Sequence, residues 1–491
     1  MMVNNTKHRA ILQSIAHRVM LERGLLPDFS PEELAELDKI QTPPVSKGGA
    51  VHDLRTLPWC SIDNDDSLDL DQITVAEATK DGTIRILVAV ANVDALVQTG
   101  SAIDDHAKTN TTSVYTAAEK FSMLPDKLST DLTSLNQDQD RLAIVIDMVV
   151  ATDGTVQGSD VYEAIVRSHA KLAYNSIAAW LEKTGPMPAA VAAVPGLAEN
   201  LSLQDKAAQL LKGHRHLLGA LSLQTIEAKP LFEGDTISSL QVQEKNRATE
   251  LIEDFMIAAN GVTVRFLTSH GFPSIRRVVH VPKRWDRIVE IATEHGSKLP
   301  ATPDSKALED FLISAKASDP VTFPDLSLTI IKLLGPGEYD AELPGANAEG
   351  HFGLAVRDYT HSTAPNRRYP DLITERLTKA AIAKKPVPYS MDDLTALAKH
   401  CTDQEDAANK VERQVEKSAA ALLLESRIGE QFDAIVTGAA DKGTWARLLS
   451  VPVEGRVIQG FQGLDVGQHT RVQLVSVDVG KGFIDLKKVH S

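Results

Sequence analysis

Apolar residues near the start of the chain recur every three or four positions, a spacing that predicts an amphipathic helix ending at Gly24. A second helix is expected from Ser30, because Pro31 suits the first helical position and Glu33 can complete a capping box. Two prolines and two glycines within residues 41–49 then predict a linker. The apolar stripe of the first helix consists of Ile11, Leu12, Ile15, Ala16, Val19 and Met20.

Residues 1–45 are therefore expected to be helical, and two arrangements are consistent with the pattern. In the first, the helices form a small helix-turn-helix-like domain of their own. In the second, they form a helical brace that packs on the rest of the chain. The apolar stripe suits both, because either arrangement buries it.

The middle of the chain mixes the two periodicities in the way that an α+β domain requires. Residues 202–218 and 402–429 show the helical period, whereas residues 83–97 and 143–156 have the character of strands. We therefore expect one α+β domain over residues 46–429.

The end of the chain has a different character, because short strand-like runs alternate with turns after Gly429. The five runs are residues 432–437, 445–449, 455–458, 472–477 and 482–486. About sixty residues with five such strands fit an all-β barrel of the OB type, which we expect over residues 430–491.

Five of the nine residues from Asp63 to Asp71 are aspartates, and so many carboxylates would repel one another without a cation. Residues 68–73 alternate between apolar and polar, which predicts a strand that points Asp69 and Asp71 to one face. Asp63 can return to that face across the preceding turn. Three converging carboxylates predict a site for Mg²⁺, or for Mn²⁺, because both ions prefer oxygen ligands.

Two other interpretations of the aspartate run fit it less well. A solvated acidic loop would not need Leu68, Leu70 and Ile73 in near-strict alternation. A calcium loop of the EF-hand type would require glycine in place of Leu68 and a bidentate glutamate in place of Thr74. Because neither a solvated loop nor an EF-hand fits these residues well, the sequence favours a site for a divalent metal such as Mg²⁺ or Mn²⁺.

Length and composition limit the number of domains, the cellular compartment and the partners that the protein can have. A chain of 491 residues is long enough for two or three domains with full-sized cores. The two cysteines, Cys60 and Cys401, match no zinc pattern and favour a reducing cytoplasm. No apolar run approaches the length of a membrane span, so we expect no membrane partner.

Beyond the aspartates, several short blocks follow one another in the order found in one enzyme family. Residues 62–73 resemble the signature of the RNase II / RNase R (RNB) family of exoribonucleases, which is Ile-Asp, a short spacer and then Asp-hydrophobic-Asp-Asp. The other matching blocks are residues 88–94, 112–115, 123–125, 134–136, 140–143, 250–256, 258–260, 351–354 and 362–371. The resemblance covers roughly residues 50–430, and so many ordered blocks make coincidence very improbable.

This resemblance implies an RNB-type catalytic domain followed by the RNA-binding barrel of that family. It implies a processive, hydrolytic 3′→5′ exoribonuclease that threads single-stranded RNA by its 3′ end and releases 5′-mononucleotides with Mg²⁺ as cofactor. We expect it to act as a monomer. The net charge of −15 does not contradict an RNA substrate, because only a channel must be basic. Candidate channel residues are the basic pairs at 276–277, 283–284 and 367–368.

The resemblance also implies roles for individual residues. Arg367 would contact a phosphate, Tyr115 would stack on the terminal base, and Glu412 would lie near the leaving nucleotide. The implied catalytic residues are Asp69, Asp71, Arg367 and Glu412; the implied metal ligands are Asp63, Asp69, Asp71 and Gln72; the implied RNA contacts are Tyr115, Arg367, Arg368, Trp445 and Phe461, with Phe483 as a further stacking candidate.

Each of these roles has a structural alternative. Arg367 could instead form an ion pair with Asp371, and Glu412 could be an ordinary glutamate on the surface of a helix. Tyr115 and the barrel aromatics could instead be core residues.

Two departures from the family pattern put the site in question. Gln72 stands where the family has a fourth aspartate, so one potential ligand brings no charge. Asn366 stands where the family usually has an apolar residue before the arginines. The rival hypothesis is therefore a catalytically weak RNA-binding or regulatory protein that keeps the fold. An endonuclease with related metal chemistry is a third.

Overall fold

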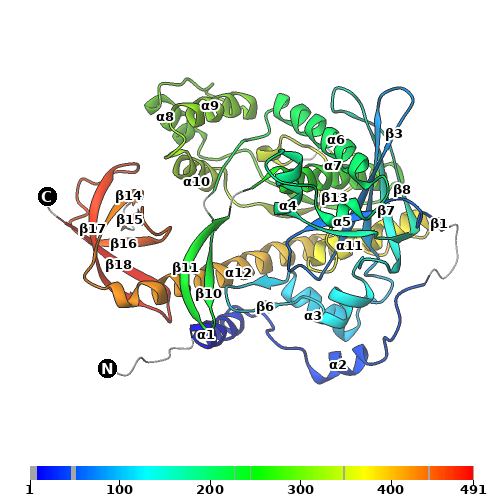
Figure 1. Cartoon of the computed structure of the whole chain (residues 1–491), viewed down its shortest axis with the longest axis horizontal. Helices are drawn as coiled ribbons and strands as arrows, with labels where there is room; N and C mark the ends of the chain where they lie inside the picture. The colour runs from blue at the N-terminus through cyan, green and yellow to red at the C-terminus, as the bar shows by residue number, and fades with distance from the viewer. Residues whose placement is uncertain are drawn as a thin grey trace.

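Figure 1 shows the computed structural model of the chain, which describes residues 8–45, 51–225, 227–243, 245–346, 349–440 and 443–489. A body of helices around a sheet lies on one side, a small β-barrel lies on the other, and a long helix runs between them (Figure 1). This mixture of elements confirms the α+β class expected from the sequence.

The body is built on a seven-stranded sheet with the order β1-β8-β7-β4-β3-β2-β9. Its strands are β1 (His52–Asp53), β2 (Cys60–Asp63), β3 (Gln72–Ala78), β4 (Ile84–Ala91), β7 (Asp140–Val150), β8 (Val156–Arg167) and β9 (Ala170–Ala173). The central strands β8, β7, β4 and β3 pair antiparallel, whereas β1 and β9 pair parallel with β8 and β2. Strand β4 is buried along almost its whole length, so both faces of the sheet require a cover.

Helices provide this cover on both sides. Ile86 and Val88 of β4 belong to the core under α6 and α7, whereas Leu87 and Ala89 belong to the core that includes α3 and α11. Alternate residues of one strand thus supply two cores, as a period of two requires. The covering helices are α3 (Ala102–Asn110), α6 (Leu197–Leu217), α7 (Arg247–Ser269) and α11 (Tyr369–Ile382).

One helix, α12 (Met391–Leu424), connects the body to the barrel. It begins with a capping box between Ser390 and Asp393, and its 34 residues make it about 51 Å long at 1.5 Å per residue. Its apolar residues enter three cores in turn, so it acts as a common wall for all of them. They are Leu394, Leu397, Ala398 and Cys401 in the body, Ala408, Val411, Val415, Ala419 and Leu422 in a core with the N-terminal helix, and Ala420, Ala421 and Leu424 in the barrel.

The C-terminal strands close into a five-stranded barrel with the order β14-β15-β16-β18-β17. They are β14 (Gln431–Ala440), β15 (Gly443–Leu448), β16 (Glu454–Gln459), β17 (His469–Asp478) and β18 (Phe483–Lys488). Each of the five expected runs falls on one strand, which confirms the OB-type barrel. Closure removes the exposed strand edges that a small open sheet would carry.

The N-terminal helices α1 (His8–Glu22) and α2 (Pro31–Leu37) form where the sequence predicts them, and the Ser30–Glu33 capping box is present. The stripe of α1 is buried against α12, whereas Leu37 of α2 packs against the body core. Within described residues 8–45 the two helices therefore make no helix-turn-helix-like unit. Each helix buries its apolar side in a different core, which is the arrangement of a brace. Residues 1–7 and the linker residues 46–49 lie outside the described part.

Helix α1 also touches the barrel and the hairpin of β10 (Glu227–Glu233) and β11 (Thr236–Gln243). Arg18 Nη2 donates to the carbonyl oxygen of Gly480 at 2.8 Å, and His8 Nδ1 accepts from the Ile237 N–H at 3.2 Å. The brace thus holds three parts of the chain together.

The remaining elements surround this frame. They are β5 (Val114–Tyr115), β6 (Lys120–Phe121), a π-helix (Lys127–Leu132), α4 (Tyr174–Leu181), α5 (Ala189–Ala192), β12 (Ser274–Val278), α8 (Trp285–Glu294), α9 (Ser305–Ser318), α10 (Phe323–Leu334) and β13 (Glu338–Glu342). Among the described residues no helix is both long enough and apolar enough to cross a membrane.

The brace generates a test of stability. Leu12 of α1 is fully buried against α12, so Leu12→Ala should lower the free energy of unfolding by about 2–5 kcal/mol in urea titrations. Leu21→Ala on the same helix is the matched control, because Leu21 is 56% exposed and should change that free energy by less than about 0.5 kcal/mol. Equal losses from the two variants would contradict the packing of α1 on α12.

Candidate active site

Asp71 is the most deeply buried aspartate of the acidic run, with 2% of its surface exposed. Its Oδ1 accepts a hydrogen bond from the backbone N–H of Asn366 at 2.9 Å, and its Oδ2 accepts from Nε of Arg367 at 3.2 Å. Burial, against the opposing effects of these two donors, raises the pKa of Asp71 to about 7. A positive charge next to this carboxylate is therefore needed to keep it ionised.

Hydrogen bonds to Ser134 and Leu135, which lie outside the sheet, hold the loop that carries the aspartates. Ser134 Oγ accepts from the N–H of Leu70 at 3.0 Å and donates to the carbonyl oxygen of Leu68 at 2.9 Å. The N–H of Leu135 donates to the carbonyl of Leu70 at 3.0 Å. The strand expected over residues 68–73 is therefore wrong at its start. It begins only at Gln72, because the earlier backbone groups bond to Ser134 and Leu135 instead of to a neighbouring strand.

Asp63 and Asp69 lie beside Asp71. Asp63 ends β2, and its Oδ1 accepts from Ser67 Oγ at 3.0 Å. Asp69 Oδ2 accepts from the hydroxyl of Tyr115 at 3.3 Å and lies 3.6 Å from Nζ of Lys120. Burial raises the pKa of Asp63, and the charge of Asp69 raises it further.

These carboxylates suit a hard divalent cation by their chemistry. Among the described residues no three carboxylate, imidazole or thiol groups are already drawn together as metal ligands, because Asp71 faces Arg367 and Asp69 faces Tyr115. The charge of Asp69 nevertheless raises the pKa of both Asp63 and Asp71, so Asp69 lies close enough to repel each of the other two carboxylates. A bound Mg²⁺ or Mn²⁺ would relieve the repulsion between these carboxylates, because both ions prefer oxygen ligands.

The side chain of Gln72 lies on the opposite face of strand β3 from that of Ile73. It is the first residue of β3 and lies in register with Val90 of β4. Val90 belongs to the core under α6 and α7, so strand alternation places the Gln72 amide on that face and Ile73 on the opposite one. The amide could meet an ion beside Asp71 only around the end of the strand.

The two neighbouring arginines have different partners. Arg367 faces Asp71, and its side chain is 41% exposed. Arg368 instead donates to Oδ1 of the buried Asp371 at 2.7 Å, and this oxygen also accepts from the N–H groups of Thr363 and Ala364 at 2.8 Å each. The ion pair with Asp371 that was the structural alternative for Arg367 is thus made by Arg368. That leaves Arg367 at the site and makes Arg368 a support of the loop.

Tyr115 and Glu412 meet at the same place from distant parts of the chain. The backbone N–H of Tyr115 donates to Oε1 of Glu412 at 2.8 Å, and Tyr115 is 45% exposed. The N–H of Ser113 donates to the carbonyl of Arg367 at 3.0 Å, which ties this strand to the arginine loop. Tyr115, Glu412, Arg367 and Asp69 therefore share one neighbourhood, and neither Tyr115 nor Glu412 is merely a core or a surface residue.

The predicted RNA contacts on the barrel lie apart from this cluster. Trp445 is half-buried on β15 in register with Arg456 of β16, and Phe461 and Phe483 are 39% and 59% exposed. Their side chains are thus accessible from outside the barrel.

Of the other predicted basic pairs, one is already neutralised. Arg276 forms ion pairs with Glu342 and Asp358 at 3.3 Å, and Arg277 forms one with Glu405 at 2.6 Å. Lys283 and Arg284 are exposed. Residues 276–277 therefore hold the body together and offer little free charge to a strand.

Sequence reasoning missed Tyr174 at the site and assigned no role to two other residues there, Asn366 and Ser134. Tyr174 follows directly after β9, whose Ala173 pairs with Asp63, and burial with the nearby charge of Asp63 raises the pKa of its phenol. Asn366 is 1% exposed, and its side-chain oxygen accepts from Thr133, whereas its Nδ2 has no hydrogen-bond partner among the described residues. Ser134 was noted only as part of a matching block. No local pattern marks these residues, because their partners are distant in sequence.

The comparisons with known proteins fit this geometry. Residues 51–384 match the RNB domain family, and residues 430–489 match the RNase II-type exonuclease C-terminal S1 domain. The chain belongs to the RNB family.

Several curated relatives are similar to this chain over most of its length, although some of them are much longer than it is. Ribonuclease R of Escherichia coli is 30% identical over 447 residues, which cover 88% of this chain and 54% of the relative. Ribonuclease R of Aquifex aeolicus is 29% identical over 510 residues, which cover 97% of this chain and 70% of the relative. This chain spans about half the length of the Escherichia, Shigella and Vibrio relatives that it matches.

Two solved structures share the fold at lower identity. RNase R of Mycoplasma genitalium superposes with a TM-score of 0.86 at 22% identity, covering 99% of this chain and 79% of its own. Yeast Ssd1, described as a pseudonuclease, superposes with a TM-score of 0.73 at 15% identity, covering 91% of this chain and 55% of its own. The fold therefore occurs with and without nuclease activity.

The different roles of the two arginines can be separated by their effect on stability. Arg368→Met leaves the buried charge of Asp371 without its cation, which should cost about 3–5 kcal/mol in the free energy of unfolding. Arg367→Met should cost clearly less, because the pKa of Asp71 is already raised to about 7 and this carboxyl can take up a proton. Urea titrations at neutral pH measure both losses. A larger loss from the Arg367 variant would reverse the assignment.

Proposed function

We propose that this chain is a hydrolytic 3′→5′ exoribonuclease that degrades single-stranded RNA processively to 5′-mononucleotides. The observation that carries the proposal is the buried carboxylate of Asp71, held between Asn366 and Arg367 beside Asp63 and Asp69. Family membership supports it. RNase R of Mycoplasma genitalium has been solved with single-stranded and with double-stranded RNA, which supports RNA as the substrate.

In this proposal Asp63, Asp69 and Asp71 hold Mg²⁺, with Mn²⁺ as a substitute, and Gln72 is a candidate neutral ligand. The bound ion supplies an activated water and neutralises charge on the scissile phosphate. The protein fixes where the carboxylates stand. Ser134 sets the loop through Leu68 and Leu70, and the N–H of Asn366 sets the orientation of Asp71.

Arg367 is suited to hold the phosphate. Its Nε is engaged by Asp71, and a guanidinium has four further N–H donors in one plane. Because the side chain is 41% exposed, those donors can reach phosphate oxygens in a forked geometry. Arg368 keeps its neighbour in place by anchoring the loop to Asp371 at the start of α11.

Tyr115 and Glu412 are suited to grip the 3′ end of the strand. The exposed ring of Tyr115 offers a face on which the terminal base can stack, while its hydroxyl and backbone are fixed by Asp69 and Glu412. Burial raises the pKa of Glu412, the carboxyl group that we place near the leaving nucleotide.

The barrel is proposed to bind the strand farther from the scissile bond. Trp445 on β15 and Phe461 in the loop after β16 are accessible aromatic side chains, and the face formed by the second and third strands is the usual nucleic-acid face of an OB fold. Bases can stack on such aromatics without sequence preference. We also propose that the enzyme works as a monomer in the cytoplasm.

The alternative is a catalytically weak RNA-binding or regulatory protein with the same fold. Gln72 favours it, because it removes one charge from the acidic set, and the likeness to Ssd1 shows that this fold alone does not guarantee catalysis. The enzyme is supported instead by the presence of Asp63, Asp69, Asp71 and Arg367 in one cluster. Arg367 bonds to Asp71, and the charge of Asp69 acts on both Asp63 and Asp71.

One assay tests the proposed function. A 5′-labelled single-stranded RNA should be shortened from its 3′ end in Mg²⁺ and left intact in EDTA, as seen on a sequencing gel. Asp71→Asn keeps the shape but removes a charge, so the rate should fall by about a hundredfold or more while RNA binding survives. Asp65→Asn is the matched control, because Asp65 belongs to the same acidic run and is exposed.

The alternatives predict other outcomes of this assay. A catalytically weak protein would leave the labelled RNA intact in Mg²⁺ as well. An endonuclease would cut a circular RNA, which has no 3′ end for an exonuclease to enter. Wild-type rates from the Asp71 variant would remove this residue from the mechanism.

The grip of Tyr115 should be visible in the final products. Tyr115→Ala removes a stacking contact worth roughly 1–3 kcal/mol, so short RNAs should dissociate earlier and the limit product should lengthen. Tyr115→Phe keeps the ring and loses only the hydroxyl that donates to Asp69, so its limit product should match that of the wild type. Identical product ladders from all three proteins would show that Tyr115 does not hold the strand.

A further inference from the structure

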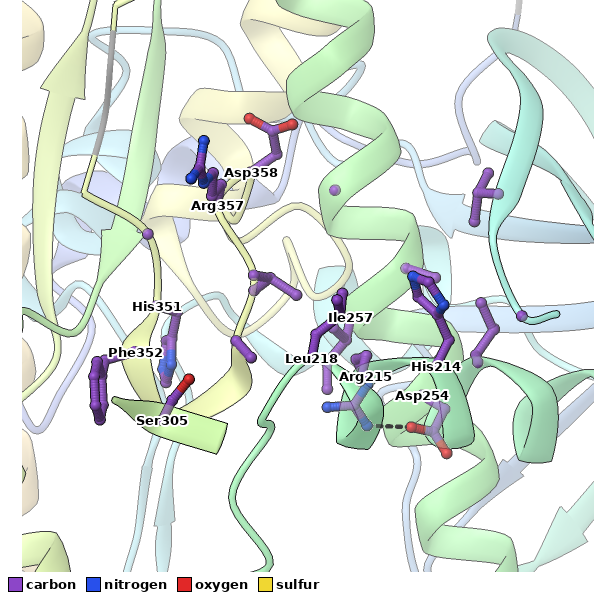
Figure 2. Close-up of a pocket in the computed structure, with 18 of the residues that line it drawn as sticks. His214, Arg215, Leu218, Asp254, Ile257, Ser305, His351, Phe352, Arg357 and Asp358 are labelled. Atoms are coloured by element: carbon purple, nitrogen blue, oxygen red, sulfur yellow. Dashed lines mark hydrogen bonds and ion pairs between the residues drawn. The ribbon is translucent and has the colours of Figure 1, made fainter. Parts of the chain in front are cut away.

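A cavity of about 950 Å³ opens away from the acidic cluster, and none of the catalytic candidates lines it. It lies between the end of α6, one side of α7, the turn that joins β7 to β8, and residues 349–358 (Figure 2). Its walls are mainly apolar, with Ile257 and Ala258 of α7 facing Val281 and Phe352. Such walls suit a flat, weakly polar group such as a nucleobase.

Two arginines contribute cationic groups to the lining of this cavity. Arg265 of α7 and Arg357 both line the cavity and are exposed, and within the described part of the chain neither is in an ion pair. The acidic residues of the rim are already engaged, since Asp358 pairs with Arg276 at 3.3 Å and Glu349 pairs with His280 at 2.6 Å. Two free guanidinium groups thus point to an anionic ligand.

Gly261 leaves room where the Arg265 side chain approaches the backbone of Asp358. A Cβ at this position would lie 3.2 Å from Nη1 of Arg265 and 3.3 Å from the carbonyl oxygen of Asp358, the residue next to Arg357. The glycine on α7 therefore brings the Arg265 guanidinium against the Arg357 segment. Desolvation by the surrounding residues lowers the pKa of Arg265, and the nearby charge of Asp358 opposes this effect without cancelling it.

The other end of the cavity carries a buried polar pair. Arg215 of α6 and Asp254 of α7 form an ion pair, which Figure 2 shows as a dashed line. Asp254 is 2% exposed, yet its Oδ2 and the Nε of Arg215 have no hydrogen-bond partner in the part of the chain that the structure describes. Buried polar atoms without partners are uncommon, and these two belong to residues that line the cavity.

We propose that this cavity is a second binding site for the phosphate of a nucleotide. Arg265 and Arg357 hold the phosphate, and the nucleoside lies along the apolar walls towards Arg215 and Asp254. The phosphate can belong to a free 5′-mononucleotide or to a phosphodiester within an RNA strand. A guanidinium recognises both in the same way, through paired N–H donors to two oxygens.

Calorimetric titration of the full-length chain in EDTA tests this site without hydrolysis. In the first arm the probe is 5′-AMP, and in the second it is a single-stranded RNA titrated at several salt concentrations. The test protein carries Arg265→Gln with Arg357→Gln. The control carries Arg287→Gln with Lys399→Gln, which removes the same charge from exposed positions on α8 and α12. A third protein, Arg367→Gln, reports binding at the acidic cluster.

The two arms distinguish the sources of the phosphate. If the site takes free nucleotides, 5′-AMP should bind the control and the Arg367 variant, and the test protein should bind it about tenfold more weakly or worse. If the site takes a strand, the slope of log K against log salt for RNA should fall by about 0.7 in the test protein, the change expected when one phosphate contact is lost. Binding of both probes by the test protein as by the control would overturn the proposal. AMP binding lost only in the Arg367 variant, with the RNA slope unchanged in the test protein, would overturn it too.

Discussion

The site depends on a buried carboxylate that needs a positive partner to stay ionised at neutral pH. Asp71 is enclosed at the start of β3, and removing its charge from water would favour the protonated form. Arg367 and the N–H of Asn366 oppose this effect, and both belong to a loop that lies almost three hundred residues further along the chain. Much of the local architecture serves to hold these two segments together. Ser134 holds the loop that leads to Asp71, and the Arg368–Asp371 pair holds the loop that carries Arg367.

Helix α12 extends this constraint to the rest of the molecule. Glu412 lies in the stretch of α12 that packs against α1, and its carboxylate holds the backbone of Tyr115 beside the acidic cluster. The same helix ends in the core of the barrel, so the proposed grip on the terminal base and the proposed strand-binding barrel share one rigid element. The brace formed by α1 supports this helix where the body core stops and the barrel core has not yet begun.

Patterns local in sequence predicted the fold well, because periodicity reports which side of an element is buried. The five barrel strands, the Ser30 capping box and the acidic run all follow from neighbouring residues. Predictions failed where a distant partner decides the outcome. The alternation from Leu68 suggested a strand, but Ser134 takes its hydrogen bonds. The sequence could not show that Arg368 and not Arg367 binds Asp371, because a one-residue step along the chain redirects the side chain.

The central claim is that the carboxylates around Asp71 form a binding site for a divalent cation, and direct metal binding tests it without relying on turnover. Mn²⁺ binding can be followed by electron paramagnetic resonance, since the free ion loses signal when it binds. The wild-type chain and the exposed-site variant Asp65→Asn should bind Mn²⁺ equally. Asp71→Asn should weaken that binding by about tenfold or more, because it removes a charged oxygen ligand. Equal Mn²⁺ affinity in all three proteins would contradict the account.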